Sequence, residues 1–223
     1  MSTTEPARKR VAILISGRGS NMASLIEAAR APDYPAGIVV VISNRPDAAG
    51  LARAAEAGIA TEVVDHRSHP DRPPFEQDLD RALVRHGVEL VCLAGFMRVF
   101  TPAFVERWAG RMLNIHPSLL PLFRGTRTHA QALEAGLMLH GCTVHYVIPE
   151  LDAGPIVAQA AVPVRPEDSE DTLAARVLAE EHSLYPFALA LVARGDASLS
   201  GSRVVFSVNV RHAAGALANP VPA

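Results

Sequence analysis

The chain has 223 residues, which is enough for one domain with a substantial core and short for two. Its 21 basic and 23 acidic residues give a formal net charge of −2, so the overall charge indicates no nucleic-acid partner, and a local cluster of Arg107, Arg111, Arg124 and Arg127 is the one feature that leaves this alternative open. The only cysteines, Cys92 and Cys142, stand in separate apolar runs, which excludes a disulfide framework and predicts buried, inert thiols. No apolar run reaches the roughly 18 residues of a membrane span, and MSTTEPARKR lacks a leader's apolar region, so we expect a cytoplasmic protein with no membrane partner.

The first half of the chain alternates short apolar runs with segments of helical composition. We expect, in chain order, a strand over 10–17, a helix over 21–30, a strand over 37–44, a helix over 47–58, a strand over 60–65, a helix over 75–87 and a strand over 88–95. Continuously apolar strands are covered on both faces, and intervening helices favour right-handed parallel crossovers. This half therefore predicts a doubly wound α/β sheet.

The second half changes in texture after a short helix and one more strand. We expect a helix over 102–108, a strand over 112–116, a helix over 129–135, strands over 141–148 and 154–164, and a long helix over 171–194 with Ser169 as its N-cap. The short connection between the two strands favours an antiparallel hairpin. The predicted fold class is α/β, a doubly wound, mostly parallel, Rossmann-like sheet with an antiparallel C-terminal portion. We expect a single domain over 11–209, with a disordered tail over 1–10 and a loose tail over 210–223.

Two polar side chains share one face of the strand over 112–116. Asn114 and His116 stand two residues apart, and Pro117 places His116 at the strand's C-terminal end, where open α/β sheets bind ligands. Asp152 lies in the turn of the expected hairpin and could converge on the same crevice, without any serine or cysteine nucleophile in an elbow. The alternatives are a core histidine held by a local partner and an aspartate that only bonds nearby backbone.

The turn after the first expected strand reads SGRGSN over residues 16–21. Its glycines let the backbone approach an anion, and free amides at a helix N-terminus, helped by Ser20 and Asn21, can hold a phosphate. The turn lacks the lysine of the nucleoside triphosphate loop and the full spacing of the dinucleotide fingerprint. A phosphate monoester therefore fits better, and a purely structural turn is the alternative.

The remaining histidines and acids indicate no metal site. His129, His140 and His145 lie close together in the sequence, but no pair has the spacing and carboxylate company of a metal site. We interpret His145 as a packed, hydrogen-bonded group in the sheet interior. Glu181 lies in the long final helix, where charged residues are mostly solvated surface, and nothing local singles it out.

Five segments follow one another along the chain: ILISGRGSN, LAGFMRVFTPAFV, GRMLNIHPSLLP, HGCTVHYVIPELDAGPI and EEHSLYP. In this order they resemble the phosphoribosylglycinamide formyltransferase family (glycinamide ribonucleotide transformylase) of purine biosynthesis, over nearly the whole chain. NIHPSLLP with a later LDAGP is typical of the wider group that moves or hydrolyses the formyl unit of 10-formyltetrahydrofolate. SGRGSN favours the glycinamide ribonucleotide branch of that group.

The resemblance implies transfer of the formyl group from 10-formyltetrahydrofolate, as co-substrate, to the amine of glycinamide ribonucleotide through a tetrahedral intermediate. It implies small-molecule partners, no metal, and a monomer or homodimer. It implies three catalytic residues, namely Asn114, His116 and Asp152. It implies ribonucleotide contacts from Gly19, Ser20, Asn21 and Glu181. It implies folate contacts from Arg72, Met97, Arg98, Val99, Phe100, Asn114, Ile148, Pro149, Glu150, Leu151 and Asp152.

Three alternatives share part of this pattern. A formyltetrahydrofolate hydrolase would use the same trio with water as acceptor, but it carries an additional N-terminal regulatory domain, and about ten residues precede the first expected strand. Methionyl-tRNA formyltransferase adds a C-terminal RNA-binding domain, for which the tail after 209 is short. A non-catalytic phosphate-ligand binding module would explain SGRGSN and leave the trio without purpose.

Ala130 and Leu178 replace polar groups that family members can carry at these positions.

Overall fold

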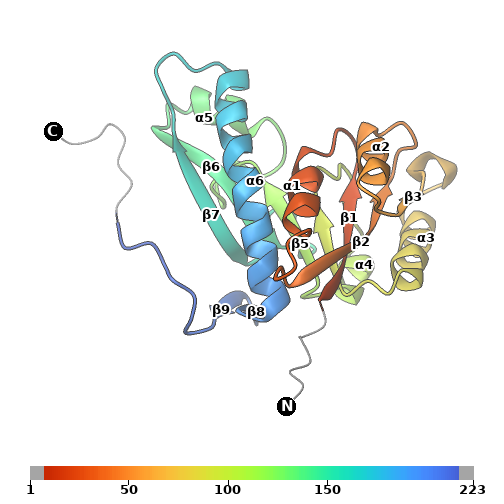
Figure 1. The fold of residues 1–223 in the computed structure, drawn as a ribbon. Helices are drawn as coiled ribbons and strands as arrows, with labels where there is room; N and C mark the ends of the chain where they lie inside the picture. Colours follow the sequence, from red (N-terminus) through yellow and green to blue (C-terminus); the bar gives the residue numbers. More distant parts are fainter. Residues whose placement is uncertain (1–7, 216–223) are drawn as a thin grey trace.

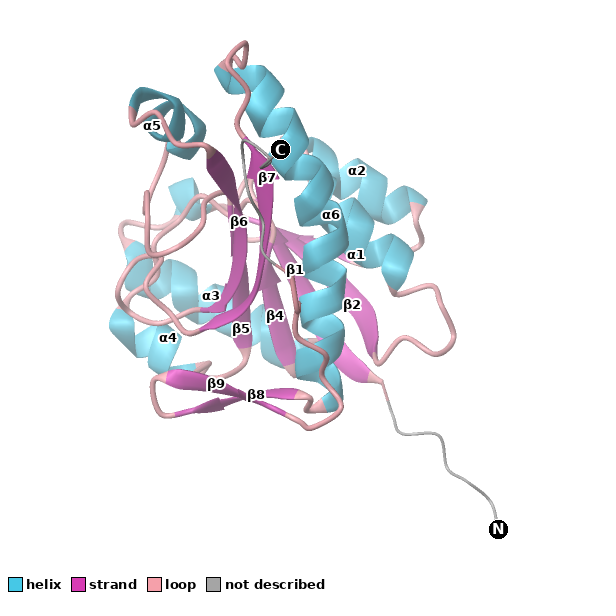
Figure 2. Cartoon of the chain, turned by 90° about the vertical axis from the view of Figure 1, so that its left-hand side faces the viewer, coloured by secondary structure: helices cyan, strands magenta, loops and turns pink. Residues whose placement is uncertain are grey.

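The computed structural model describes residues 8–215 as a seven-stranded sheet with helices on both faces (Figures 1 and 2). The strands are β1 (Lys9–Ile15), β2 (Ala36–Ser43), β3 (Thr61–Val63), β4 (Leu90–Leu93), β5 (Met112–His116), β6 (Leu139–Tyr146) and β7 (Ile156–Pro163). The helices are α1 (Ser20–Ala28), α2 (Ala49–Glu56), α3 (Arg72–Arg85), α4 (Pro102–Arg107), α5 (Thr128–Glu134) and α6 (Glu170–Arg194), with a 3₁₀ turn η1 (His66–Ser68).

The sheet has the strand order β3-β2-β1-β4-β5-β6-β7. Strands β1 to β5 pair in parallel, and β6 and β7 add as antiparallel neighbours. The expected doubly wound, mostly parallel sheet with an antiparallel C-terminal portion is therefore confirmed. The chain winds outward from β1 through β2 to β3 and then returns to the other side of β1 at β4, so a topological switch point lies between β1 and β4. Open α/β sheets bind ligands at the carboxyl edge of such a point.

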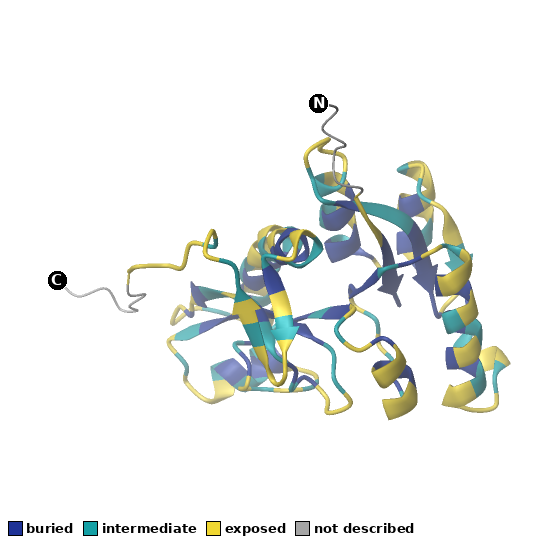
Figure 3. Cartoon of the chain, turned by 90° about the horizontal axis from the view of Figure 1, so that it is seen from below, coloured by how far each residue is buried: buried dark blue, intermediate teal, exposed yellow. Residues whose placement is uncertain are grey.

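Two apolar layers cover the two faces of the sheet. On one face, β-strand residues pack against α1, α2 and α6, with Met22, Leu25 and Leu189 among the buried contacts. On the other face they pack against α3 and α4, through Phe75 and Phe104 among others. Figure 3 shows the strands largely buried and the helices buried on one side only. Burial on both faces is the physical reason why the strands read as continuous apolar runs.

Most of the expected elements are present, with two differences. Helix α3 begins at Arg72 rather than at Phe75, because the prolines that follow Arg72 lie in its first turn, where a missing N–H costs nothing. A hairpin of β8 (Ala197–Ser200) and β9 (Arg203–Phe206) was not expected. Both cysteines are buried and unpaired, as expected.

The boundaries of α6 follow from its sequence. Ser169 is the N-cap of α6, as expected, and its hydroxyl accepts a hydrogen bond from the Thr172 amide.

The domain limits at 11 and 209 remain a prediction, since residues 1–7 and 216–223 of the two expected tails lie outside the described residues. In the part of the chain that the structure describes, no helix has the length and apolarity to cross a membrane.

The pairing of β6 with β7 requires a glycine at position 141. A Cβ added to Gly141 would lie 1.9 Å from the backbone oxygen of Ala160, whereas a Cβ at Gly37 in β2 would meet no atom within 4 Å. Gly141→Ala is therefore expected to lower the free energy of unfolding by about 1–3 kcal/mol or more, because the strands must move apart. Thermal and urea unfolding check this, with Gly37→Ala as the matched control. Equal shifts in both variants would contradict the expected close approach.

Candidate active site

The structure brings Asn114, His116 and Asp152 together at the carboxyl end of β5. Asn114 and His116 lie two apart on β5, and Asp152 lies in the connection between β6 and β7. The His116 Nδ1 and Asp152 Oδ2 atoms are 3.4 Å apart, and the two side chains are almost fully buried. The expected convergence of these residues is thus present, and it places an imidazole and a carboxylate side by side in a site with little water.

Both ring nitrogens of His116 face hydrogen-bond acceptors. Its Nε2 lies 2.8 Å from the backbone oxygen of Phe123, so this nitrogen carries a proton and donates it to the carbonyl. Its Nδ1 faces the Asp152 carboxylate. A doubly protonated ring satisfies both acceptors at once. In this arrangement, Nε2–H can reach a substrate oxygen only if the loop that carries Phe123 yields its place.

The turn that carries Asp152 is held in a conformation that few residues adopt. Asp152 has φ 48°, in the left-handed region, where aspartate and asparagine are the most tolerated residues after glycine. Its Oδ2 accepts a hydrogen bond of 2.9 Å from the Gly125 amide. A Cβ at Gly154 would lie 1.7 Å from the backbone oxygen of Tyr146, so only glycine fits there. The backbone therefore fixes the carboxylate toward His116.

His145 joins this cluster from the neighbouring strand. It is buried and hydrogen-bonded, in line with its interpretation as a packed interior group, but its contact with the trio was not expected. Its Nδ1–H donates to the Tyr146 oxygen at 2.9 Å, so in the neutral ring Nε2 is free to accept from Asn114 Nδ2 at 3.2 Å. Burial lowers the pKa of His145, which favours this neutral form. The imidazole thereby orients the Asn114 amide, and its Nε2 lies 3.8 Å from Asp152 Oδ1.

The SGRGSN turn lines a cavity of about 400 Å³ at the switch point. The cavity walls include the expected ribonucleotide residues Gly19, Ser20 and Asn21, together with Met97 and Arg98 from the segment after β4. Gly19 is the N-cap of α1, with φ 71°, and neither a side-chain cap nor an acidic residue occupies the first turn. Unfilled amides at a helix N-terminus attract anions.

Glu181 lies on α6, next to the last residue of the SGRGSN turn. Its side chain is buried, so the alternative of a solvated surface group is wrong. Its Oε2 accepts a hydrogen bond of 2.6 Å from Asn21 Nδ2. Burial raises the pKa of Glu181, against the lowering effect of the Asn21 hydrogen bond. Among the described residues, Asn21 Oδ1 has no hydrogen-bond partner, so this pair keeps an open acceptor. Two expected ribonucleotide residues, 160 positions apart in the chain, are thus in direct contact.

Apart from Asn114 on β5, the expected folate residues lie in the segments 97–100 and 148–152 and at the start of α3. Met97, Val99 and Leu151 are large apolar side chains that are 74%, 52% and 51% exposed. Arg72 donates a long hydrogen bond of 3.4 Å to the Val99 oxygen, and Arg98 lines the cavity. Ile148 is half-buried, whereas Pro149 and Glu150 are exposed. An exposed apolar surface of this kind is typical of a binding site.

Phe100 differs from the other expected folate residues. Its side chain is buried and stacks between Phe96 and Phe104, with ring centroids 5.3 Å and 4.5 Å apart. It therefore packs in the core under α4 and can contribute only its backbone to the surface.

In the described part of the chain, no group of three or more histidine, cysteine, aspartate or glutamate side chains could hold a metal ion.

Comparison with known proteins identifies the family. The family model described as formyl transferase matches residues 9–189. The chain belongs to the formyl transferase family. The sequence is 45% identical over 185 residues to "Phosphoribosylglycinamide formyltransferase" of Escherichia coli, covering 83% of this chain and 87% of that protein. It is 49% identical over 195 residues to the human "Trifunctional purine biosynthetic protein adenosine-3", covering 87% of this chain and 19% of that protein.

The formyl transferase fold is also present in solved structures. Glycinamide ribonucleotide transformylase 1 from Symbiobacterium toebii superposes with a TM-score of 0.86 at 44% identity, covering 89% of this chain and 94% of that one. A formyltetrahydrofolate deformylase from Pseudomonas syringae superposes with a TM-score of 0.82 at 28% identity, covering 89% of this chain and 66% of that one. The resemblance read from the sequence motifs is thereby confirmed. The chain spans between 14% and 20% of the length of the trifunctional relatives, with 19% for the human protein.

Proposed function

We propose that this formyl transferase moves the formyl group of 10-formyltetrahydrofolate to the amine of glycinamide ribonucleotide, as in de novo purine biosynthesis. The products are formylglycinamide ribonucleotide and tetrahydrofolate. The observation that carries the proposal is 45% identity to a protein named for this reaction, over 87% of that protein's length. The described site supports it with the buried His116 and Asp152 and the half-buried Asn114, together with a cavity lined by an anion-attracting helix end.

The reaction involves three changes of charge or protonation, and the cluster has a group that could assist each of them. The amine attacks the formyl carbon and loses a proton, the formyl oxygen becomes negative, and the bond to the folate nitrogen breaks as that nitrogen gains a proton. Asn114 has a second N–H besides the one directed at His145, and with His116 it would donate hydrogen bonds to the oxyanion. Such a donor contributes about 3–4 kcal/mol in other enzymes. Asp152 beside His116 would stabilise a protonated ring and order a water for proton relay.

Direct transfer needs both substrates in one crevice and no covalent intermediate with the enzyme. The phosphate would bind at Gly19, Ser20 and Asn21, while Glu181 would contact the ribose or glycinamide end. The folate would lie along 97–100 and 148–152, between Arg72 and the trio. Holding both substrates in place converts a bimolecular step into an effectively unimolecular one. A cytoplasmic location and a monomeric or homodimeric state accompany this proposal as predictions.

Hydrolysis of 10-formyltetrahydrofolate is the second candidate, because a deformylase shares the fold. The buried Glu181–Asn21 pair favours the ribonucleotide, since water as acceptor needs neither a carboxylate at that place nor an anion site at α1. A direct test mixes the protein with 10-formyltetrahydrofolate and follows the release of tetrahydrofolate. The proposal predicts release that depends on glycinamide ribonucleotide, whereas equal release in its absence favours the hydrolase.

Glu181→Gln is expected to separate ribonucleotide use from stability. Loss of a charge-assisted hydrogen bond, about 1.5–3 kcal/mol, should raise the KM for the ribonucleotide by roughly 10- to 150-fold. Because burial raises the pKa of Glu181 in the folded state, its contribution to stability is present at low pH and is lost as the pH rises through the folded pKa. The ligand-free variant should therefore unfold at the same or a higher temperature at pH 7.

Steady-state kinetics and thermal unfolding between pH 4 and pH 8 check both parts of this prediction. Glu180→Gln, at the exposed neighbouring position on α6, is the matched control and should change neither quantity. An unchanged KM in Glu181→Gln would remove Glu181 from the ribonucleotide site. A large fall in unfolding temperature at pH 7 would show that the ionised carboxylate supports the fold instead.

A further inference from the structure

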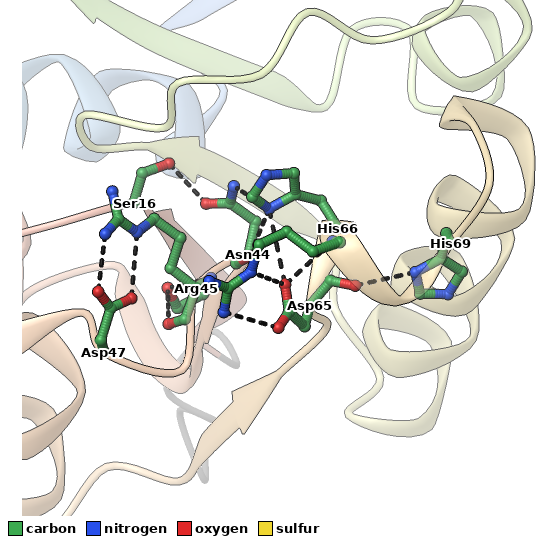
Figure 4. A network of polar contacts seen from close by, with 9 residues as sticks. Ser16, Asn44, Arg45, Asp47, Asp65, His66 and His69 are labelled. Carbon is green, nitrogen blue, oxygen red and sulfur yellow. Dashed lines mark hydrogen bonds and ion pairs between the residues drawn. The ribbon is translucent and has the colours of Figure 1, made fainter.

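Ser16 lies between the two halves of the proposed site. It directly follows β1 and opens the SGRGSN turn, and its amide donates to the Gly95 oxygen at 3.2 Å. Its hydroxyl oxygen accepts a hydrogen bond of 2.8 Å from the Met97 amide. The same hydroxyl donates to Asn44 Oδ1 at 2.6 Å (Figure 4). The backbone at the start of the 97–100 segment is therefore anchored to β1 through a single side chain.

Asn44 fixes the direction of the Ser16 hydroxyl. It directly follows β2 and is 3% exposed. The His66 ring contacts Asn44, with Nδ1 2.8 Å from the Asn44 backbone oxygen and 3.1 Å from Asn44 Nδ2, and the His66 amide donates to the same backbone oxygen at 3.3 Å. These contacts hold Asn44 in place, so its Oδ1 accepts from Ser16 and the hydroxyl lone pairs face the Met97 amide. Neither Ser16 nor Asn44 has a place in the proposed catalytic or binding set.

Apart from the buried Phe100 ring at its end, the anchored segment has little packing of its own to hold its shape. The Met97 and Val99 side chains are 74% and 52% exposed, so the backbone around them depends on hydrogen bonds from outside the segment. At its far end, the Thr101 amide donates to the buried Glu76 carboxylate at 2.6 Å. At its near end, the contact with Ser16 has the same role. Loops with few buried apolar contacts change conformation at low free-energy cost unless they are anchored in this way.

We propose that Asn44 is a positioning residue for the folate co-substrate, acting through the Ser16 hydroxyl on the Met97 amide and so on the shape of the 97–100 segment. The inference rests on the proposed function, because that function assigns 97–100 to the folate. Asn44 touches no reacting atom in this role. Its removal frees the Ser16 hydroxyl to rotate, and the Met97 amide loses an oriented acceptor in a site where water replaces it poorly.

A direct contact between Asn44 and a substrate is the competing explanation, since Ser16 and Asn44 both line the cavity. The two explanations differ in how mutations combine. If Asn44 acts only through Ser16, then Asn44→Ala has no further effect once the Ser16 hydroxyl is absent. If Asn44 contacts a substrate itself, the effects of the two substitutions add.

The test measures tetrahydrofolate binding by isothermal titration, and the KM of both substrates, in Ser16→Ala, Asn44→Ala and the double variant. Each single variant is expected to weaken tetrahydrofolate binding and to raise the folate KM by about 5- to 30-fold, with the ribonucleotide KM within about twofold of wild type. The double variant should equal the single variants. Additive losses, or a rise confined to the ribonucleotide KM, would overturn the inference.

Two further variants exclude a general loss of structure. Asn44→Asp keeps an acceptor for the Ser16 hydroxyl and should restore most of the folate affinity. Ser207→Ala removes a comparable serine bond, 2.7 Å to Asp196 Oδ1, far along the chain and should leave both KM values unchanged. Wild-type protein that neither binds tetrahydrofolate nor transfers formyl would overturn the proposed function itself. Wild-type binding and transfer with unchanged folate affinity in the alanine variants would overturn only the role of Asn44.

Discussion

Replacing His116 with alanine is expected to lower kcat by about 10²- to 10⁴-fold, with the KM for the ribonucleotide nearly unchanged. The ring is buried, with Nδ1 3.4 Å from Asp152 Oδ2 and Nε2–H directed at the Phe123 oxygen. No other side chain in the cluster can supply a proton from that place, because His145 uses its Nδ1–H on the Tyr146 oxygen and burial lowers its pKa. In the proposed mechanism, loss of His116 would therefore remove an oxyanion contact and a proton donor together.

Steady-state kinetics with both substrates test this expectation, and thermal unfolding shows whether the variant is folded. His86→Ala is the control, because His86 is the C-cap of α3 and its ring contacts Glu62 near the surface, away from the trio. Turnover within tenfold of wild type in His116→Ala would end the proposed mechanism. A loss of the same size in His86→Ala would indicate damage to the fold.

Asp152→Asn is expected to lower kcat by about 10²- to 10³-fold while the protein keeps its fold. Asparagine tolerates the left-handed φ of 48° and can still accept the Gly125 amide hydrogen bond, so the turn survives. The negative charge beside His116 is lost, and the protonated ring loses its partner. Asp152→Ala should lose the same activity and also unfold at a lower temperature, because alanine strains the turn.

The contrast between the two substitutions at position 152 isolates the charge from the shape of the turn. Asp168→Asn serves as the control. Asp168 lies in the loop before α6, and its carboxylate pairs with Arg176 of that helix. The kinetics of this variant should match wild type. Asp152→Asn with wild-type turnover would show that the carboxylate is only a structural cap for the Gly125 amide.

Much of the fold could be predicted from the apolar pattern of the sequence, because that pattern follows from which faces of each element are buried. Strands β1, β2 and β4 are covered on both faces and so read as unbroken apolar runs, which made the parallel sheet predictable. Ser169 was predictable as a cap because its partner, the Thr172 amide, is local. The β8–β9 hairpin was not expected, because ASLS and RVVF are four-residue strands with weak apolar patterning.

The site was predictable where its residues share a strand and unpredictable where they meet across the sheet. Asn114 and His116 lie on one face of β5, so their common direction follows from the sequence alone. His145 enters the cluster only because β6 is antiparallel and places it opposite Asn114, a register that the sequence does not specify. If the register of β5 and β6 were known, the place of His145 beside Asn114 could be predicted.

Contacts between distant segments explain the other differences. Glu181 is buried because α6 packs beside α1, where Asn21 bonds it, and helix charge patterning alone indicated solvent. Phe100 belongs to a stack of three aromatic rings, with Phe96 and with Phe104 of α4, rather than to an open surface. The link from Ser16 to Asn44 joins the ends of two neighbouring strands, 28 residues apart. Such pairings depend on strand order, which single-sequence patterns leave undetermined.

The most direct test of the central claim follows a ¹³C-labelled formyl group from 10-formyltetrahydrofolate by NMR, with and without glycinamide ribonucleotide. We expect the label to appear as the formamide of formylglycinamide ribonucleotide, in equal amount to the tetrahydrofolate released, with little free formate. His116→Ala should suppress the label transfer, and His86→Ala should not. Labelled formate as the main product, at the same rate whether or not the ribonucleotide is present, would contradict the account and assign the protein to hydrolysis.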